Sequence, residues 1–430
     1  MKTGVLAVAP AIFCSVALAL LAGVTEQAPN SSSLRFVAFG AGLPTSGQWR
    51  EGFRIADMNG DGHPDIVLTT QRKKPGSPPT IFLGDGKGSW ARWTDAHFPP
   101  LAYDYGDVEV ADFNRDGHMD LALGVHFHGI LALLGDGKGN FSNASSGLEF
   151  SADKAGSVFS SRALRAADWN GDSLPDLVAV SEGPQSAIGV HRRNDGVAIY
   201  LNQGVHDGTL SWRRLDLTLS PGNFSDSIAL GDFNGDHHTD VASGSSNVGR
   251  KDLINLWRAD GKPGPVLVDI PYTYHYVRAV ASGDFDHDGR AGLLVAYDLL
   301  DKDVWYSAAD LYLLRPDGKW ERRAIAKEQT RVGLVAIASG HFRNRTTRDV
   351  VALTALGETI FFLADGHGGF TTKTHLIPNY PGNCRGSHIE VADLDGDGID
   401  EIVTSFADEP GEEGCPTGGG VTVWKAVSGP

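Results

Sequence analysis

The stretch DMNGDGHPDIV at residues 57–67 decides the fold, because versions of it return along the whole chain. The copies that follow read DFNRDGHMDLA, DWNGDSLPDLV, DFNGDHHTDVA, DFDHDGRAGLL, HFRNRTTRDVV and DLDGDGIDEIV, and they start at positions 112, 168, 232, 284, 341 and 393. Successive starts lie 52 to 64 residues apart. Seven copies at this spacing predict an array of similar structural units.

Each unit shows the same order of strand signals around the motif. An alternating segment such as 52–56 precedes the motif, and an apolar segment such as 65–70 follows it. A third segment then ends in an Asp-Gly turn, as in TIFLGDGKGSW at 80–90, and a fourth segment such as 212–219 completes the unit. Asp-Gly turns between apolar runs indicate β-hairpins. The pattern predicts an all-β fold, a seven-bladed β-propeller of four-stranded antiparallel blades.

The two ends of the chain predict how the last blade is completed. The last unit stops after its third strand at 421–427, and residues 34–44 resemble a fourth strand without a unit of its own. We expect this N-terminal strand to complete the last blade and close the ring, which would remove an exposed strand edge. The expected domains are a signal peptide or N-terminal anchor at 1–24, a linker at 25–33 and the propeller at 34–430.

The N-terminal segment and the cysteines indicate an exported protein. One lysine precedes a long run rich in Ala, Leu and Val, which is typical of an export signal, although the run is also long enough for an uncleaved membrane anchor. We expect a secreted, extracellular or periplasmic monomer, with membrane attachment only if residues 1–24 are retained. The remaining cysteines, Cys384 and Cys415, fit one disulfide, with two unrelated free thiols as the alternative.

The charge of the chain bears on its partners. The formal net charge is −16, and no basic stripe is apparent, which argues against a nucleic-acid partner. Much of the negative charge lies in the repeated motif. The motif places oxygen-bearing side chains at its first, third, fifth and ninth positions, with a tight turn at the sixth, so that these oxygens can converge on one ion.

Oxygen ligands without His or Cys favour calcium over zinc or copper. Five matched copies argue against aspartate-rich turns that bind no ion. We therefore predict about five Ca²⁺ sites, formed by Asp57/Asn59/Asp61/Asp65, Asp112/Asn114/Asp116/Asp120, Asp168/Asn170/Asp172/Asp176, Asp232/Asn234/Asp236/Asp240 and Asp393/Asp395/Asp397/Glu401.

Two copies of the motif depart from this pattern. Gly292 stands at the ninth position of one copy, so its site is expected to bind metal weakly or not at all; its acids are Asp284, Asp286 and Asp288. In the copy that starts at position 341, Arg343 and Arg345 occupy ligand positions, so no metal is expected there, and Arg345 could replace the cation.

The loops and the GDGKG turns at 84–88 and 135–139 resemble the FG-GAP (VCBS-type) repeats of integrin α-chain propellers and of secreted bacterial proteins. The resemblance covers residues 34–430 and implies calcium ligands at the acidic positions of the five full loops. It does not extend to Gly292 or to the 341–349 copy. Because such propellers serve adhesion, sugar binding and, in some proteins, catalysis, the resemblance implies no single function.

Variable segments predict where a partner binds. Loops after the second and fourth strands of each blade share the face opposite the metal loops, and they carry insertions at 71–79, 181–196, 297–310 and 406–420. We call this the insertion face. Its aromatic side chains could stack on sugar rings or anchor a protein, or could simply cover the ends of the blades. The candidate binding residues are Tyr103, Tyr105, Asp107, Arg162, Asp226, Tyr274, Tyr276, Arg278, Trp305, Tyr306 and His388.

Charged residues also recur three positions before the motif starts. Arg54, Glu109, Arg165 and Glu390 are expected to form ion pairs near the central channel, with a polar ligand pocket as the alternative. His126 and His128 lie on alternate positions of one expected strand, where structural roles are favoured over a two-histidine metal site.

The sequence contains no readable active site. HExxH, GxSxG and P-loop motifs are missing, and GDSL at 171–174 lies inside a proposed calcium loop. We therefore expect a recognition or adhesion module that binds an extracellular glycan or protein. The alternatives are a carbohydrate-active lyase or hydrolase, which a cluster of Asp107, Arg162, Asp226, Arg278 and His388 would favour, and a purely structural module.

Overall fold

The computed structural model describes residues 34–50, 52–153, 157–182, 196–217, 225–244, 254–257, 275–329, 333–408 and 414–428. All regular elements within these ranges are β-strands. None of the described residues forms a helix that is long and apolar enough to cross a membrane. The segments expected to be a signal peptide or anchor (1–24) and a linker (25–33) lie outside the described residues.

The described strands form seven antiparallel sheets, which follow one another along the chain. In chain order the strands are β1 (Leu34–Ala38), β2 (Phe53–Ala56), β3 (Asp65–Leu68), β4 (Thr80–Gly84), β5 (Trp90–Arg92), β6 (Val108–Ala111), β7 (Asp120–Val125), β8 (Gly129–Gly135), β9 (Phe141–Asn143), β10 (Ser161–Ala167), β11 (Asp176–Ser181), β12 (Val197–His206), β13 (Thr209–Leu217), β14 (Ile228–Gly231), β15 (Asp240–Gly244), β16 (Ile254–Trp257), β17 (His275–Gly283), β18 (Gly292–Asp301), β19 (Val304–Leu314), β20 (Trp320–Gln329), β21 (Leu334–Gly340), β22 (Asp349–Thr354), β23 (Thr359–Ala364), β24 (Phe370–Thr374), β25 (Arg385–Ala392), β26 (Glu401–Ala407) and β27 (Gly419–Ser428).

Six of the described sheets contain four strands each. Five of them take their four strands in chain order, β2–β5, β6–β9, β10–β13, β17–β20 and β21–β24, and the sixth has the order β1-β27-β26-β25. The sheet of β14, β15 and β16 has three described strands, and residues 258–274, which follow β16, lie outside the described part. Every motif connects the first strand of its sheet to the second, which is the position that the sequence predicted.

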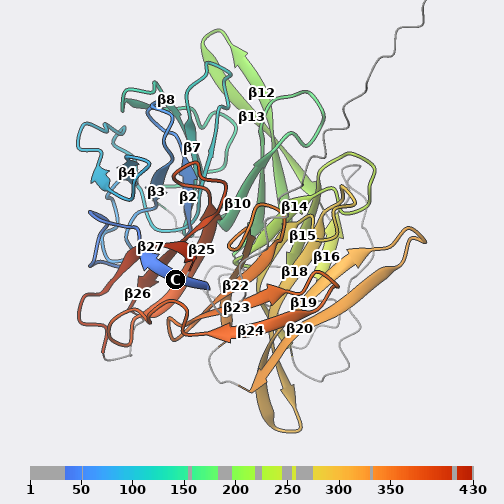
Figure 1. Cartoon of the computed structure of the whole chain (residues 1–430). Coiled ribbons are helices and arrows are strands. Elements are labelled where there is room, and N and C mark those ends of the chain that lie inside the picture. The colour runs from blue at the N-terminus through green and yellow to red at the C-terminus, as the bar shows by residue number, and fades with distance from the viewer. Residues whose placement is uncertain are drawn as a thin grey trace, which may run out of the picture.

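The sheets are arranged around a common centre in chain order (Figure 1). Neighbouring first strands contact one another in the series β2, β6, β10, β14, β17, β21 and β25, and β25 also contacts β2. The first strand of each sheet therefore faces the centre, and the other strands extend outward. This is the arrangement of a β-propeller, and it confirms the predicted all-β propeller of four-stranded antiparallel blades.

The N-terminal strand β1 belongs to the last sheet. It pairs antiparallel with β27, with Leu34 opposite Ser428 and Ala38 opposite Trp424. The sequence predicted this pairing for residues 34–44, of which 34–38 form the strand. A disulfide between Cys384 and Cys415 joins the segments that precede β25 and β27 in the same sheet. The predicted disulfide is thus present within the last sheet.

The apolar core lies between neighbouring sheets. The residue four positions before each motif start is at most 6% exposed in all seven repeats; these residues are Phe53, Val108, Leu164, Ile228, Val280, Ile337 and Ile389. Phe53, for example, packs against Leu394 and Val403 from the preceding sheet. Burial of one such side chain stabilises the fold by roughly 1.5–3 kcal/mol, so adjacent blades are held together mainly by apolar contacts.

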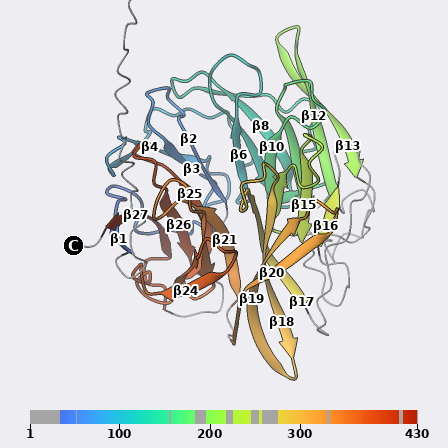
Figure 2. The same ribbon diagram turned by 45° about the vertical axis from the view of Figure 1, so that its right-hand side comes forward.

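Two hairpins are longer than the others. β12–β13 and β18–β19 project from the body in opposite directions (Figure 2). The sequence prediction of an insertion loop at 297–310 is wrong, because these residues form the outer part of the β18–β19 hairpin, which turns at Lys302 and Asp303. Residues 297 and 299 of β18 are buried tyrosine and leucine, so an apolar alternation extends the strand beyond the usual blade length.

Candidate functional site

In the six copies of the motif that begin with aspartate, this first acid organises the loop. In the first repeat, the Asp57 carboxylate accepts hydrogen bonds from the backbone N–H groups of Gly60, Asp61 and Gly62 at 2.8, 3.1 and 2.8 Å. Such a tight turn requires left-handed backbone, with φ of 72° at Gly60 and 87° at Gly62. The backbone of the loop is therefore wrapped around the Asp57 carboxylate by these hydrogen bonds.

The third and fifth positions lie on the same side of the turn in the first three loops. Asn59 Nδ2 donates to Asp61 at 3.0 Å, and Asn59 Oδ1 accepts the Asp61 backbone N–H at 3.0 Å. The same side-chain contact recurs between Asn114 and Asp116 and between Asn170 and Asp172. Carboxylate and amide oxygens of the motif thus gather inside one short loop, which is the donor set that calcium prefers.

The fourth loop departs from this arrangement. Asn234 Nδ2 donates to the buried ninth-position acid Asp240 at 2.9 Å and not to the fifth-position Asp236. Asn234 Oδ1 still accepts the Asp236 backbone N–H at 2.9 Å, while the Asp236 carboxylate accepts the backbone N–H of His238 at 3.0 Å. Asn234 thereby gives the buried Asp240 carboxylate a hydrogen-bond donor. The sequence analysis proposed all four residues of this loop as calcium ligands, and that proposal stays a prediction.

The ninth position has a second role that the sequence analysis missed. Asp65 is fully buried at the start of β3, and it accepts the backbone N–H groups of Met58 at 2.8 Å and Gly84 at 2.9 Å. Asp120 binds Phe113 and Gly135 in the same way. The acid therefore ties the metal loop to the third strand of its blade. The sequence could have indicated this structural role, because the ninth-position acid is the first residue of a buried strand.

Burial makes these ninth-position charges unfavourable in the absence of a cation. It raises the pKa of Asp65 and Asp176 to about 6, and that of Asp120 and Glu401 to about 7. In the loops that start at positions 57, 112 and 168, no lysine or arginine of the described residues forms an ion pair with a ligand acid. A divalent cation would supply the missing positive charge, so the residues present fit Ca²⁺.

In each of the three C-terminal copies of the motif, a basic side chain binds an acid of the loop. Three acids lie together in two loops of the described residues, with carboxylate oxygens of Asp284, Asp286 and Asp288, and of Asp393, Asp395 and Glu401, within 4.8 Å of one another. Arg290 binds Asp288 in the first of these loops, and Lys425 binds Asp395 and Asp397 in the second.

In the copy that starts at position 341, Arg343 binds Asp349 at 2.5 and 2.8 Å. The sequence analysis named Arg345 as a residue that could replace the cation there. Arg345 instead donates to the backbone carbonyl of Asp397 in the neighbouring loop, because Arg343 already reaches the buried acid.

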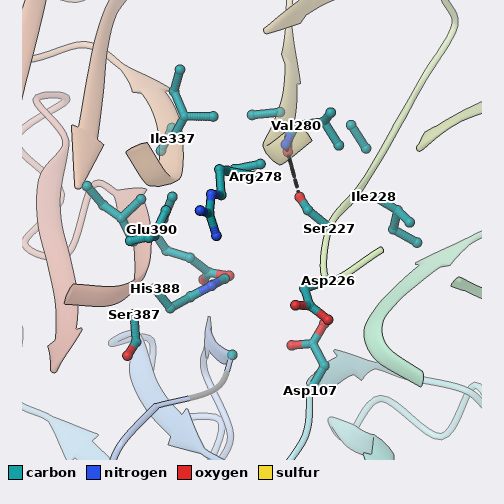
Figure 3. A pocket seen from close by; sticks show the side chains of 18 of the residues that line it. Asp107, Asp226, Ser227, Ile228, Arg278, Val280, Ile337, Ser387, His388 and Glu390 are labelled. Carbon is teal, nitrogen blue, oxygen red and sulfur yellow. Dashed lines mark hydrogen bonds and ion pairs between the residues drawn. The ribbon is translucent and has the colours of Figure 1, made fainter. Parts of the chain in front are cut away.

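A cavity of about 550 Å³ lies at the centre of the propeller and is lined by first strands and the segments before them (Figure 3). It contains all five residues whose clustering the sequence analysis associated with an enzyme: Asp107, Arg162, Asp226, Arg278 and His388. These residues come from five different blades. The sequence therefore identified the lining of this cavity, although the residues differ in what they contact.

Arg54 is the centre of an ion cluster in the channel. Its guanidinium donates to Glu390 at 2.6 Å, Glu109 at 2.9 Å and Asp107 at 3.3 Å, and also to the carbonyls of Phe53 and Leu164. Burial opposes the charge, yet the three carboxylates raise the pKa of Arg54. Burial also raises the pKa of Glu109 to about 7. The expected ion pairing near the channel is present, and it links four blades.

Asp107 is structural rather than available to a ligand. It is 3% exposed, and its Oδ2 accepts the Leu164 backbone N–H at 2.9 Å and Arg165 Nη1 at 3.1 Å. Its Oδ1 accepts the backbone N–H of Val108 at 3.0 Å. Both oxygens are thus engaged by the protein, and burial raises the pKa of this carboxyl.

The mouth of the cavity carries a second ionic network. Arg162 Nη2 donates to Asp226 at 2.6 Å, and Arg162 Nε lies 3.3 Å from Glu182. Glu182 also binds His126 and the Ser160 hydroxyl, and these partners lower its pKa although burial opposes the charge. The Asp226 side chain is 46% exposed, so it remains open to solvent. Sequence reasoning missed Glu182, whose segment carries no motif.

Two further candidates point into the cavity in Figure 3. Arg278 Nε binds Asp298 at 2.7 Å, and the Arg278 side chain is 39% exposed. His388 Nε2 lies 3.3 Å from Glu390, and its ring packs edge-on against Phe53. These side chains combine a fixed position with access to the cavity.

The four aromatic candidates whose side chains are described have different surroundings. Tyr103 is buried, and its hydroxyl donates to the Pro99 carbonyl, so it covers a blade end. The ring of Tyr105 packs against that of His126, with ring centres 4.3 Å apart and planes tilted by 31°. Trp305, on β19, is 39% exposed, whereas Tyr306 lies beneath Lys327. Tyr274 lies outside the described residues, and the side chain of Tyr276, on β17, is also outside them.

The two histidines of the 126–128 turn have separate partners. His126 Nδ1 binds Glu182, whereas His128 Nδ1 lies 2.7 Å from the Ser151 carbonyl oxygen. These contacts support the structural roles that the sequence analysis favoured over a shared metal site.

Comparison with known proteins agrees with the fold. Residues 57–123 match the family model of the FG-GAP-like repeat. The structure resembles that of BBS1N in a crystal structure of BBS1N in complex with ARL6DN, soaked with lead; the TM-score is 0.53 and the identity 11%, over 91% of this chain and 97% of that chain. No curated protein matches the chain. The molecule is therefore a β-propeller that contains an FG-GAP-like repeat, and the remote likeness to BBS1N shows the fold alone.

Proposed function

We propose that this protein is a secreted, calcium-binding recognition module that holds an extracellular glycan or protein at the insertion-face mouth of its central cavity. The observation that carries this proposal is the set of ionic side chains from several blades that converges on the 550 Å³ cavity. Polar groups fixed by a rigid scaffold around a concave site are the usual basis of specific binding.

The contacts of the cavity residues favour binding over catalysis. Asp107, the most deeply buried candidate carboxylate, has both oxygens engaged by backbone and arginine donors. Asp226 remains exposed, but Arg162 binds it and balances its charge. Paired carboxylate and guanidinium groups suit hydrogen bonding to sugar hydroxyls or to polar side chains of a protein.

The class of fold supports a macromolecular partner. FG-GAP-like propellers serve as interaction modules, and the similar propeller BBS1N was crystallised in complex with ARL6DN. A protein partner is therefore included in the proposal beside a glycan. Calcium would be held by the acidic loops on the opposite face and would stabilise the scaffold rather than contact the partner.

The second candidate function is a carbohydrate-active lyase or hydrolase. It is favoured by the convergence of Asp107, Arg162, Asp226, Arg278 and His388 on one cavity. Catalysis would require Asp226 or His388 to act as the acid or base, because Asp107 is saturated by hydrogen bonds.

A binding screen tests the proposal. The purified full chain would be applied to glycan and polysaccharide arrays and used to capture extracellular proteins, with calcium and with chelator. We expect a bound ligand whose affinity falls at least tenfold in Arg278→Gln and Asp226→Asn. Lys319→Gln, on an exposed side chain away from the cavity, serves as the control.

Ligand binding that both cavity variants leave unchanged would contradict the proposed site. Release of shortened or unsaturated sugar products from a bound polysaccharide would favour the enzyme instead.

A further inference from the structure

Lys425 lies inside the last acidic loop. This residue belongs to β27, and its ammonium group binds the carboxylates of Asp395 and Asp397, the latter at 2.6 Å. It also lies 3.6 Å from Glu401 Oε1. The ammonium group therefore contacts three of the four side chains that the sequence analysis assigned to a calcium ion at this loop.

The charge of Lys425 is held firmly in this place. Its side chain is 18% exposed, and the ammonium lies 5.4 Å from the centre of the Phe39 ring. Burial opposes the charge, yet the surrounding carboxylates raise the pKa of Lys425. One ammonium group is thus held among three acids of the loop.

Strand register shows that this lysine differs from the residue found at the same position in most of the other sheets. Trp424 lies opposite Ile402, which follows the ninth-position acid, and Lys425 is the next residue along β27. The equivalent position in five other sheets is leucine; these residues are Leu83, Leu134, Leu201, Leu313 and Leu363. In the remaining sheet the equivalent position is Arg258, also a basic residue, which lies outside the described residues.

We propose that the Lys425 ammonium is the built-in cation of the 393–401 loop and that this loop consequently takes no calcium. A calcium ion at the centre of these acids would lie within a few ångströms of a second positive charge, and the same oxygens cannot surround both. The proposed calcium sites then number four rather than about five, and loop 393–401 joins loop 341–349, where Arg343 binds Asp349.

Reciprocal exchange of the two residue types tests the inference. Lys425→Leu installs the residue found at this position in the other sheets, and Leu83→Lys places an ammonium beside the 57–65 loop. Bound calcium would be counted by native mass spectrometry on the full chain. We expect Lys425→Leu to bind one ion more than the wild type, and Leu83→Lys to bind one ion fewer.

A second comparison uses the wild-type loops and does not require the lysine variant to fold. Asp116→Ala and Asp397→Ala remove the fifth-position acid from two loops. We expect the first to lose one ion and the second to leave the count unchanged. Hydrogen exchange should rise in 112–122 on chelation but not in 393–403.

The inference is overturned if Lys425→Leu and the wild type bind equal numbers of ions, or if Asp397→Ala loses one. The inference about Lys425 rests on the proposed calcium function only for the total number of ions that the wild type binds. A wild type without any calcium, beside a Lys425→Leu variant that binds one ion, would refute the proposed calcium function and support the role of Lys425.

Discussion

At the scale of single residues, the acids of one motif differ in what they do. The fifth-position Asp116 lies in an exposed loop, whereas the ninth-position Asp120 is buried and accepts two backbone N–H groups. Both count as oxygen ligands in the sequence, where they look equivalent. Only the structure separates an acid that could serve the ion alone from an acid that also holds the blade together.

The first prediction compares these two acids. We expect Asp120→Ala to lower the free energy of unfolding by roughly 2 kcal/mol or more even in chelator, because two buried N–H groups lose their acceptor. Asp116→Ala should have little effect in chelator. Urea unfolding of both variants, with and without calcium, measures the difference. Equal midpoints for the two variants in chelator would show that Asp120 acts only through the metal.

The second prediction concerns Glu109 in the central ion cluster. Burial raises its pKa from 4.5 to about 7, so the folded protein retains this proton where the unfolded chain has lost it. The folded state binds more protons between these values, and the contribution of Glu109 to stability is therefore lost as the pH rises from about 4.5 to about 7.

In chelator we accordingly expect Glu109→Gln to lose less stability than the wild type between pH 5 and pH 8. Urea midpoints at the two pH values measure this difference, and parallel losses in both proteins would contradict it.

At the scale of elements, the repeated motif predicted the strands well because its signals are local. Turn residues, alternation and the ninth-position acid all lie within a few residues of the strands they define. The β18–β19 hairpin was missed because its turn at Lys302 and Asp303 contains no glycine, although both residues adopt positive φ of 48° and 65°. Lys425 was missed because its contact with the 393–401 loop depends on the β26–β27 register, which the motif does not encode.

The third prediction concerns the disulfide of the last sheet. Cys384 and Cys415 are 31 positions apart, and the bond restricts the unfolded chain over this loop. Replacement of both cysteines by serine should lower the free energy of unfolding by about 2–4 kcal/mol. Chemical unfolding of the oxidised and reduced wild type beside the double variant measures the change. A double variant as stable as the oxidised protein would exclude a stabilising role.

At the scale of the whole molecule, the sequence predicted the propeller blades and the lining of the cavity. It did not predict which hydrogen bonds and ion pairs each lining residue forms. Counting back from the motifs located Arg54, Glu109 and Glu390 near the channel. Which oxygen each arginine reaches depends on side chains from several blades and cannot be derived from one repeat. The identity of the partner likewise depends on surface chemistry that no motif specifies.

The fourth prediction addresses calcium and the stability of the full propeller. If the acidic loops bind Ca²⁺ in the folded state only, calcium stabilises the folded state. Chelation should then lower the melting temperature by several degrees. Thermal unfolding with calcium and with chelator measures the shift. Magnesium at the same concentration is the control, and an unchanged melting curve in chelator would count against the calcium loops.

The pairing of β1 with β27 has a consequence for how the molecule is made. Residues 34–38 are made before every other described strand, but they find their hydrogen-bonding partner only in the ten-residue strand β27. Strand β1 must therefore wait, without this partner, until β27 has been made. Nascent chains stopped before residue 419 should accordingly keep that strand accessible to proteases, and protection should arrive only with the last strand.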